Sequence, residues 1–468
     1  MADDIVFLTA GALLRHYRRG NLSPMEVTQG VLDRIERLNP ALTAFIHVDH
    51  EGALAAAQES EQRWQEGRPL GLLDGVPTTI KDVVVAKGWT TRFGSLTTDA
   101  DSPSPVDAPA TARLREQGAV LLGLTASPEF GWKAITDSPL AGITRNPWDL
   151  SRTPGGSSGG ASAAAALGLG ALHVGTDGGG SIRIPAGFTG ICGHKPSYGR
   201  VPAHPLSPFG TVAHVGPMAR SVEDLALMLS VMAGPDPRDP YALPPAEQDY
   251  RVGLEAGIAG LKIGYSPDLG YADVDPEVAT AVAAAVEGLS DLGATVETVE
   301  PPFARPLETF HVHWFAGAAR RMSQIPEERR SLADPGLQEI AAIGRGYSLP
   351  DYQQAVAERE ELMRTMRAFH EDYDLLVTPS LTIPAFEAGL EVPESSGLGR
   401  WTEWASFSYP FNLTQQPACS VPCGLTAAGL PIGLQIVGPR YDDALVLRAA
   451  RAFETIHSFQ APPEPPLR

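Results

Sequence analysis

Two glycine- and serine-rich segments of the chain contain residues whose types and spacing suit acyl-transfer chemistry. In DGGGSIR, residues 177 to 183, Ser181 follows three glycines and is our candidate nucleophile. Glycines let backbone N–H groups turn toward one point, which is the arrangement that an oxyanion requires. The predicted oxyanion hole comprises the N–H groups of Gly178, Gly179, Gly180 and Ser181.

A serine hydroxyl is a weak nucleophile and needs a base. Lys81 interrupts the apolar, strand-like run GVPTTIKDVVV. Burial in such a run would lower the pKa of its amine, and a neutral amine can act as a base. For this segment alone, the alternative is a surface lysine at the end of a strand. His173, His194 and His214 carry no recognisable motif, so we expect them to be core or surface histidines.

The other segment, TPGGSSGG at residues 153 to 160, allows several interpretations. A flexible linker should have polar, low-complexity flanks, but this segment runs directly into ASAAAALGLGALHV. GGSSG matches the Gly-x-Ser-x-Gly pattern of a nucleophile elbow, yet LSRTP precedes it instead of a hydrophobic strand. No phosphate-binding or dinucleotide-binding glycine motif is present. The pattern therefore favours a preorganised site over a hinge.

The elements that must position these residues begin with a well-marked helix. Ser23 and Glu26 have the spacing of a capping box, and Pro24 occupies the first helical position. Apolar residues then recur on one face, which predicts a helix to about Asn39. We expect an N-terminal helical region over about residues 1–60.

Segments further along the chain alternate between strand and helix patterns. TARLREQGAVLLGLT predicts a helix end followed by a buried strand, and GLKIGYS, DPEVATAVAAAVEGLSDLG and ATVETVE predict strand, helix and strand. YDLLVTPS and PIGLQIVG predict further strands, the second followed by a helix over about 442–456. This alternation predicts an α/β fold with a single large mixed β-sheet covered by helices on both faces. We expect one domain over residues 1–468, with a Pro-rich surface connection at 235–250 and a Pro-rich C-terminal tail at about 460–468.

Composition and charge exclude several classes of partner. Thirty-six basic against 55 acidic residues give a net charge of −19, and no Lys/Arg run supplies a nucleic-acid-binding face. Three cysteines cannot form a disulfide framework, so Cys192, Cys419 and Cys423 are expected to be buried thiols in a reducing compartment. The apolar stretch at 161–174 is too short to span a membrane. We expect a soluble, cytoplasmic protein without membrane or nucleic-acid partners.

Taken together, these segments resemble the amidase signature family of serine hydrolases. GVPTTIKD, TPGGSSGG and GTDGGGSIRIPAGFTGICGHKPS are similar to its three characteristic blocks, in the same order. Ser157 and Ser181 are 24 positions apart, as in that family. NLTQQPACSVPCG and GLPIGLQIVGPRYDD resemble its C-terminal block, so the similarity covers roughly residues 10 to 458.

The resemblance implies a role for each matching residue. Lys81 matches the catalytic lysine, Ser157 the bridging serine held by a cis peptide, and Ser181 the nucleophile. Supporting roles are implied for Ser158, Asp177 and Arg183, and substrate contacts for Gly131, Trp132 and Ser157. The family's chemistry needs no metal or organic cofactor. It also allows a homodimer, because dimers are frequent among its members.

The resemblance leaves the substrate open. It implies hydrolysis of amides, with aryl or small amides, anilides, carbamates and esters as candidates, and the GGG turn resembles that of stand-alone bacterial amidases. The alternatives are a glutamine-hydrolysing subunit of a tRNA amidotransferase-like complex and a scaffold without catalysis, although the Lys/Ser/Ser set is intact. Aromatic residues in RWTEWASFSYPF, 400 to 411, either line a pocket or belong to the core. Gln415 stands where the family commonly has glycine, which predicts altered contacts there.

Overall fold

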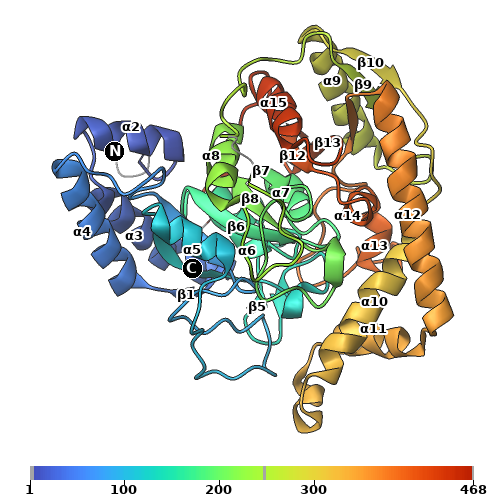
Figure 1. Ribbon diagram of the computed structural model, residues 1–468, viewed down its shortest axis with the longest axis horizontal. Coiled ribbons are helices and arrows are strands. Elements are labelled where there is room, and N and C mark those ends of the chain that lie inside the picture. Colours follow the sequence, from blue (N-terminus) through green and yellow to red (C-terminus); the bar gives the residue numbers. More distant parts are fainter. Residues whose placement is uncertain (1–4, 246–248, 466–468) are drawn as a thin grey trace.

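The computed structural model describes residues 5–245 and 249–465, and a large mixed β-sheet crosses its centre (Figure 1). Within those residues the main sheet has 11 strands. Their spatial order is β1 (Phe45–Val48), β3 (Val120–Thr125), β2 (Pro77–Lys81), β6 (Leu172–Asp177), β8 (His214–Ala219), β7 (Cys192–Lys195), β12 (Ala418–Leu425), β13 (Pro431–Val437), β11 (Leu375–Pro379), β9 (Lys262–Tyr265) and β10 (Thr295–Thr298). A small separate sheet pairs β4 (Asp137–Ser138) with β5 (Gly142–Ile143).

The parallel pairing of β2 with β6 creates the edge on which the candidate site is built. Thr78 pairs with Leu172 and Thr79 with His173. Because parallel strands end at the same edge of a sheet, this register brings Lys81, the last residue of β2, beside the end of β6. Both strands lie in buried runs of the sequence, and every residue of β2 is buried.

Helices surround the sheet. They are α2 (Ala10–Arg19), α3 (Pro24–Leu42), α4 (His50–Gln65), α5 (Pro109–Glu116), α6 (Gly159–Ala166), α7 (Arg183–Thr189), α8 (Val222–Met232), α9 (Pro276–Asp291), α10 (Leu307–Ser323), α11 (Pro335–Gly346), α12 (Leu349–Asp372), α13 (Trp401–Trp404), α14 (Pro410–Leu413) and α15 (Asp443–Glu454), with short 3-10 turns at Glu129–Gly131, Gly210–Val212 and Glu327–Leu332. In Figure 1, α2, α3 and α4 lie on one side of the molecule, and α10, α11 and α12 lie on the opposite side.

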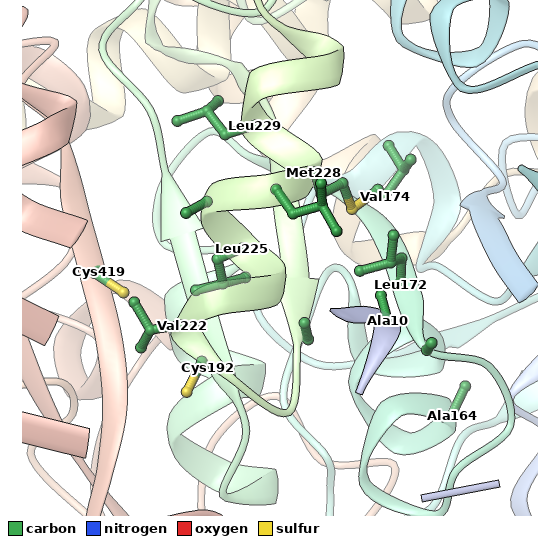
Figure 2. Packing of buried hydrophobic residues seen from close by; sticks show 14 of the residues in the cluster. Ala10, Ala164, Leu172, Val174, Cys192, Val222, Leu225, Met228, Leu229 and Cys419 are labelled. Atoms are coloured by element: carbon green, nitrogen blue, oxygen red, sulfur yellow. The ribbon is translucent and has the colours of Figure 1, made fainter. Parts of the chain in front are cut away.

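Strand β7 shows how both faces of the sheet are covered. Cys192 packs with Val222 and Leu225 of α8 in the large hydrophobic cluster drawn in Figure 2. The next residue, Gly193, faces the other way, and a Cβ there would lie 2.8 Å from the side chain of Ile182, just before α7. Successive residues of a strand point to opposite faces, so α8 and α7 cover opposite sides. The predicted mixed sheet with helices on both faces is confirmed.

The capping-box helix is confirmed at its start and is longer than predicted. The side chains of Ser23 and Glu26 cap each other's backbone, and α3 then continues past Asn39 and Pro40 to Leu42. Pro40 removes only one backbone donor close to the helix end, so the last turn is tolerated. The region over 1–60 is mostly helical as predicted, but residues 45–48 form the edge strand β1, and residues 1–4 lie outside the described residues.

The later strand and helix predictions agree with the structure. GLKIGYS, DPEVATAVAAAVEGLSDLG and ATVETVE form β9, α9 and β10, and the helix expected over about 442–456 is α15. Parts of the predicted surface connection and C-terminal tail, residues 246–248 and 466–468, lie outside the described residues. In the part of the chain that the structure describes, no helix combines the length and apolar character needed to cross a membrane.

The small-residue helix α6 leads to a first prediction, because it packs directly on backbone. A Cβ at Gly160 would lie 2.5 Å from both Ala126 N and Ala44 O. Gly160→Ala should therefore destabilise the protein by about 1–3 kcal/mol through overpacking, with loss of activity as the adjacent serine loop shifts. The measurement is the free energy of unfolding from urea denaturation.

Gly30→Ala is the matched control. Gly30 also lies within a helix, α3, but its nearest neighbour to an added Cβ is 4.0 Å away. This substitution should stabilise the protein by about 0.5–1 kcal/mol, because alanine restricts the unfolded chain more than glycine does. Equal effects of the two substitutions would contradict the described packing of α6.

Candidate active site

Lys81 is completely buried, and its amine lies among three hydroxyl groups. Its Nζ is 2.7 Å from Ser157 Oγ, 2.9 Å from Ser158 Oγ and 2.8 Å from Thr176 Oγ1. The structure thus brings together two residues singled out in the sequence, Lys81 and Ser157, with the supporting Ser158. The alternative of a surface lysine is wrong.

Burial lowers the pKa of Lys81 well below the ordinary lysine value of 10.5. The negative charge of Asp177 acts in the opposite direction, but the effect of burial is larger. In the described part of the chain, Lys81 forms no ion pair, so only hydroxyl groups solvate its amine. An amine in this environment favours its neutral form, which is the form that can accept a proton.

The two serine-bearing loops are joined to each other by backbone. The N–H of Ser158 donates to the carbonyl of Ser181 at 3.1 Å. The Gly156–Ser157 peptide bond is cis, as the resemblance implied. A Cβ at Gly156 would lie 2.5 Å from the Ile135 carbonyl, so only glycine fits beside that stretch of backbone. Ser157 and Ser181 consequently face the same space.

The glycines before Ser181 do not all point their N–H groups the same way. The N–H of Gly180 donates to Asp177 Oδ1 at 2.8 Å, so this group is engaged within the loop and cannot also bind an oxyanion. Within the described residues, the N–H groups of Gly178, Gly179 and Ser181 have no protein acceptor. Those three groups are the donors that remain for a ligand.

Asp177 and Arg183 brace the turn from inside. Arg183 donates through Nε to Asp177 Oδ2 and through Nη2 to Asp177 Oδ1, both at 2.9 Å, and both side chains are fully buried. Asn412 Nδ2 donates to Asp177 Oδ1 at 2.8 Å, and Arg183 Nη1 donates to Gln435 Oε1 at 2.7 Å. Burial alone would raise the pKa of Asp177, but the charge and hydrogen bonds of Arg183 hold it well below its ordinary value.

A cavity of about 320 Å³ opens above these groups. Ser157, Thr176, Gly178 and Ser181 lie along it, and most of the remaining wall is apolar, including Phe93, Phe130, Phe209, Pro202, Pro205, Pro208 and Trp314. Cavities of this size and lining suit small organic ligands. The seryl hydroxyls form its polar floor.

Of the two neighbouring residues expected to contact substrate, Gly131 lines the cavity and Trp132 does not. Gly131 lines the cavity, has a φ of 73°, and a Cβ there would lie 3.2 Å from Ser157 Oγ. Trp132 is fully buried, and its ring packs against Gly336, away from the described cavity wall. The positive φ of Gly131 turns the chain between these neighbours, so only Gly131 faces the site.

Asp82, directly after Lys81, holds a loop that forms part of the cavity wall. Its carboxylate accepts the N–H groups of Arg92 and Gly94, both at 2.7 Å. Burial raises the pKa of Asp82 to about 7, although these backbone donors oppose the effect. Phe93, between the two donors, has a φ of 56° and lines the cavity. Asp82 is therefore a positioning residue for this wall.

The three histidines considered as bases occupy structural positions. His173 contacts Thr79 Oγ1 at 2.8 Å, and His194 contacts Asp443 Oδ1 at 3.1 Å. His214 lines the cavity, but its Nδ1 donates to the Val212 carbonyl at 2.8 Å. Burial lowers the pKa of all three imidazoles. None of their described hydrogen bonds reaches a site serine.

The three cysteines are buried thiols, as predicted. Cys192, Cys419 and Cys423 are free and buried, and burial raises the pKa of each. Within residues 5–245 and 249–465, no three His, Cys, Asp or Glu side chains gather as a metal site would require.

Trp401, Trp404, Tyr409 and Gln415 lie outside the cavity wall. Trp401, Trp404 and Tyr409 are buried in an aromatic cluster and do not line the described cavity, so the core alternative is correct. Gln415 has a φ of 62°, in the left-handed region that favours glycine, which explains the glycine common at this position. Its amide bonds to the Thr211 carbonyl and to Arg440, outside the cavity wall.

Sequence patterns missed two residues of the site. Thr176 supplies the third hydroxyl around Lys81. Its position at the end of a buried strand, one residue before Asp177, is the sequence feature that could have identified it. Asn412 lies in the NLTQQP segment, yet nothing in that segment indicates a bond to Asp177, 235 residues away in the chain. Only the tertiary fold, which places α14 beside the end of β6, brings Asn412 to Asp177.

The chain is similar to known proteins over almost its whole length. The Amidase family model matches residues 26–447. The chain is 38% identical to an acylamidase of Rhodococcus erythropolis, covering 97% of this chain and 96% of that protein. It is 36% identical to a glutamyl-tRNA(Gln) amidotransferase subunit of Myxococcus xanthus, covering 97% and 98%. Among solved structures, a bacterial aryl acylamidase of the amidase signature family superposes with a TM-score of 0.89 at 30% identity, covering 96% of each chain.

The buried amine of Lys81 predicts a specific dependence of stability on pH. Between the lowered folded-state pKa and 10.5, the unfolded chain binds a proton that the folded chain does not. The free energy of unfolding must therefore rise with pH across that window. The stability gained in this way disappears again as the pH falls toward the folded-state pKa. Relative to Lys81→Met, the wild type should gain stability as pH is raised from neutral toward 10.5.

The measurement is urea denaturation of both proteins over that range. Lys87→Met, which removes an exposed lysine, controls for the loss of one positive charge. A stability difference between wild type and Lys81→Met that stays constant with pH would show that the amine of Lys81 is charged in the folded protein.

Proposed function

The chain belongs to the amidase signature family of C–N hydrolases, and we propose that it cleaves amides through Lys81, Ser157 and Ser181 by way of an acyl-enzyme. One observation carries this proposal. The buried amine of Lys81 lies 2.7 Å from Ser157 Oγ, at the floor of a cavity that Ser181 also lines.

The surrounding hydroxyls direct the lone pair of a neutral Lys81. The Ser158 hydroxyl donates to the Thr176 carbonyl at 3.1 Å, so toward Lys81 it can only accept. We assign the two N–H groups of the neutral amine to Ser158 Oγ and Thr176 Oγ1. The lone pair is left for the hydroxyl of Ser157, which makes Lys81 the base for that proton.

Acylation follows from this arrangement. Lys81 takes the proton of Ser157 while Ser157 takes the proton of Ser181, and Ser181 Oγ attacks the acyl carbon. The carbonyl oxygen becomes an oxyanion, which the N–H groups of Gly178, Gly179 and Ser181 stabilise. The C–N bond then breaks, and Ser157 passes its proton to the leaving nitrogen. Ser157 regains a proton from Lys81, which returns to its neutral form.

Deacylation uses the same groups in reverse. Water attacks the acyl ester on Ser181 and gives a proton to Ser157, while Ser157 gives its own proton to Lys81. The bond between the acyl carbon and Ser181 Oγ breaks, Ser181 takes a proton from Ser157, Ser157 takes one back from Lys81, and the carboxylic acid leaves. Protein side chains alone carry every proton in this scheme.

The cavity wall supports aryl amides, anilides or aryl carbamates as substrates. Phe93, Phe130, Phe209 and Trp314 contribute aromatic surface beside the seryl floor. The similarity to proteins described as an acylamidase and an aryl acylamidase supports the same class. The second candidate, glutamine hydrolysis for a tRNA amidotransferase, is supported by the similarity to the Myxococcus xanthus amidotransferase subunit. A largely apolar wall favours the aryl class, because glutamine would leave that wall in contact with polar groups.

Release of ammonia or amine by the purified chain tests the proposal. The substrates are a primary aryl amide, an acetanilide, an aryl carbamate and glutamine. Ser181→Ala should lower turnover of the aryl substrates by a factor on the order of 10³ or more, because the acyl-enzyme cannot form. Turnover that persists in Ser181→Ala would refute the mechanism, and turnover of glutamine alone would favour the amidotransferase alternative.

A further inference from the structure

The last turn of α10 places two arginines on the wall of the otherwise apolar cavity. Arg320 and Arg321 line it together with Gln324, and no Asp or Glu lies along the described wall. The guanidinium of Arg321 lies over the ring of Phe130, 4.1 Å from its centroid. The protein as a whole has a net charge of −19, yet this wall carries two basic residues and no acidic ones.

Neither arginine is neutralised by the protein. In the described part of the chain, neither forms an ion pair, and Arg320 is exposed. Arg321 is half-buried, its Nη1 reaches only Gln324 Oε1 at 3.4 Å, and its Nε has no acceptor. Arg183 is the contrast, because all of its nitrogens donate to partners. Arg321 therefore retains donors for a ligand.

The acid whose charge acts on Arg321 is Glu129, and it is engaged elsewhere. The hydroxyl of Ser95 donates to one of its oxygens, and the backbone N–H of Asp334 donates to the other. Burial raises the pKa of Glu129, and these two hydrogen bonds act in the opposite direction. A planar anion entering the cavity would meet Arg321 without a competing carboxylate bond.

Phe130 connects the arginine to the reacting groups. Its ring carries Arg321 on one side, and the next residue, Gly131, lies against Ser157. Because Phe130, Arg321 and the two serines all line this cavity, an aromatic ligand beside Phe130 can present one end to the serines and the other to the guanidinium. Such a ligand has an amide at one end and an anion at the other.

We propose that the cavity selects anilides whose aryl amine carries a carboxylate, with Arg321 as the principal anion-binding residue and Arg320 assisting it. This inference rests on the proposed function, of which it specifies the substrate class. Arginine binds carboxylates through paired N–H donors, and a partly buried site strengthens the interaction.

Binding to Ser181→Ala, which leaves the ligand uncleaved, tests the proposal. The matched ligands are 4-acetamidobenzoate and 4-nitroacetanilide, because a nitro group has the planar shape of a carboxylate without its net charge. Calorimetry should show the anion binding about tenfold more tightly. Adding Arg321→Gln should abolish this preference, and Arg321→Lys should retain part of it. Arg345→Gln removes a charge from the last turn of α11, outside the described wall, and should leave the preference unchanged.

Equal binding of the two ligands, or a preference that survives both Arg321→Gln and Arg320→Gln, would overturn the inference. Should Arg321→Gln fail to fold, Arg320→Gln at its exposed position is the second variant. It should reduce the preference for 4-acetamidobenzoate over 4-nitroacetanilide by about threefold. Turnover separates this inference from the proposed function. Ser181-dependent cleavage of 4-nitroacetanilide without anion preference would refute only the inference, and Arg321-dependent binding without cleavage would refute only the function.

Discussion

The ion pair between Asp177 and Arg183 determines what Lys81 can do. Asp177 ends β6, close to the buried amine, and a free carboxylate there would pair with Lys81 and keep it protonated. Two bonds from Arg183 and one from Asn412 instead hold that carboxylate inside the turn. Its charge is thereby offset, and burial dominates the pKa of Lys81. The same carboxylate accepts the Gly180 N–H in the glycine turn, so one buried pair affects both Lys81 and the turn that carries Ser181.

The cavity joins elements that are far apart in the chain. Its seryl floor comes from the loop before α6, which carries Ser157, and from the turn after β6, which carries Ser181. Trp314 and the two arginines come from α10. In the mechanism that we propose, the hydroxyl floor carries out the reaction and the arginines of the wall select the ligand. Reaction type and substrate choice would then depend on different parts of the fold.

Sequence patterns predicted the parts of this structure that depend on local physics. The capping box of α3 and the alternation of strands and helices follow from neighbouring residues, and Lys81 was notable because it interrupts an apolar strand. The structure adds what depends on tertiary contacts. Thr176 joins the site only because β6 pairs with β2, and the N–H of Gly180 turns inward because Asp177 accepts it. Such pairings connect residues that no local pattern links.

Covalent labelling of the nucleophile distinguishes the roles proposed for Ser181, Ser157 and Lys81. The intact chain would be treated with a fluorophosphonate, and the modified peptide would be identified by mass spectrometry. We predict one adduct, on Ser181, and strongly reduced labelling when Lys81 is replaced by alanine, since the neutral amine activates the hydroxyl through Ser157. An adduct on Ser157, or unchanged labelling of Ser181 without Lys81, would contradict it.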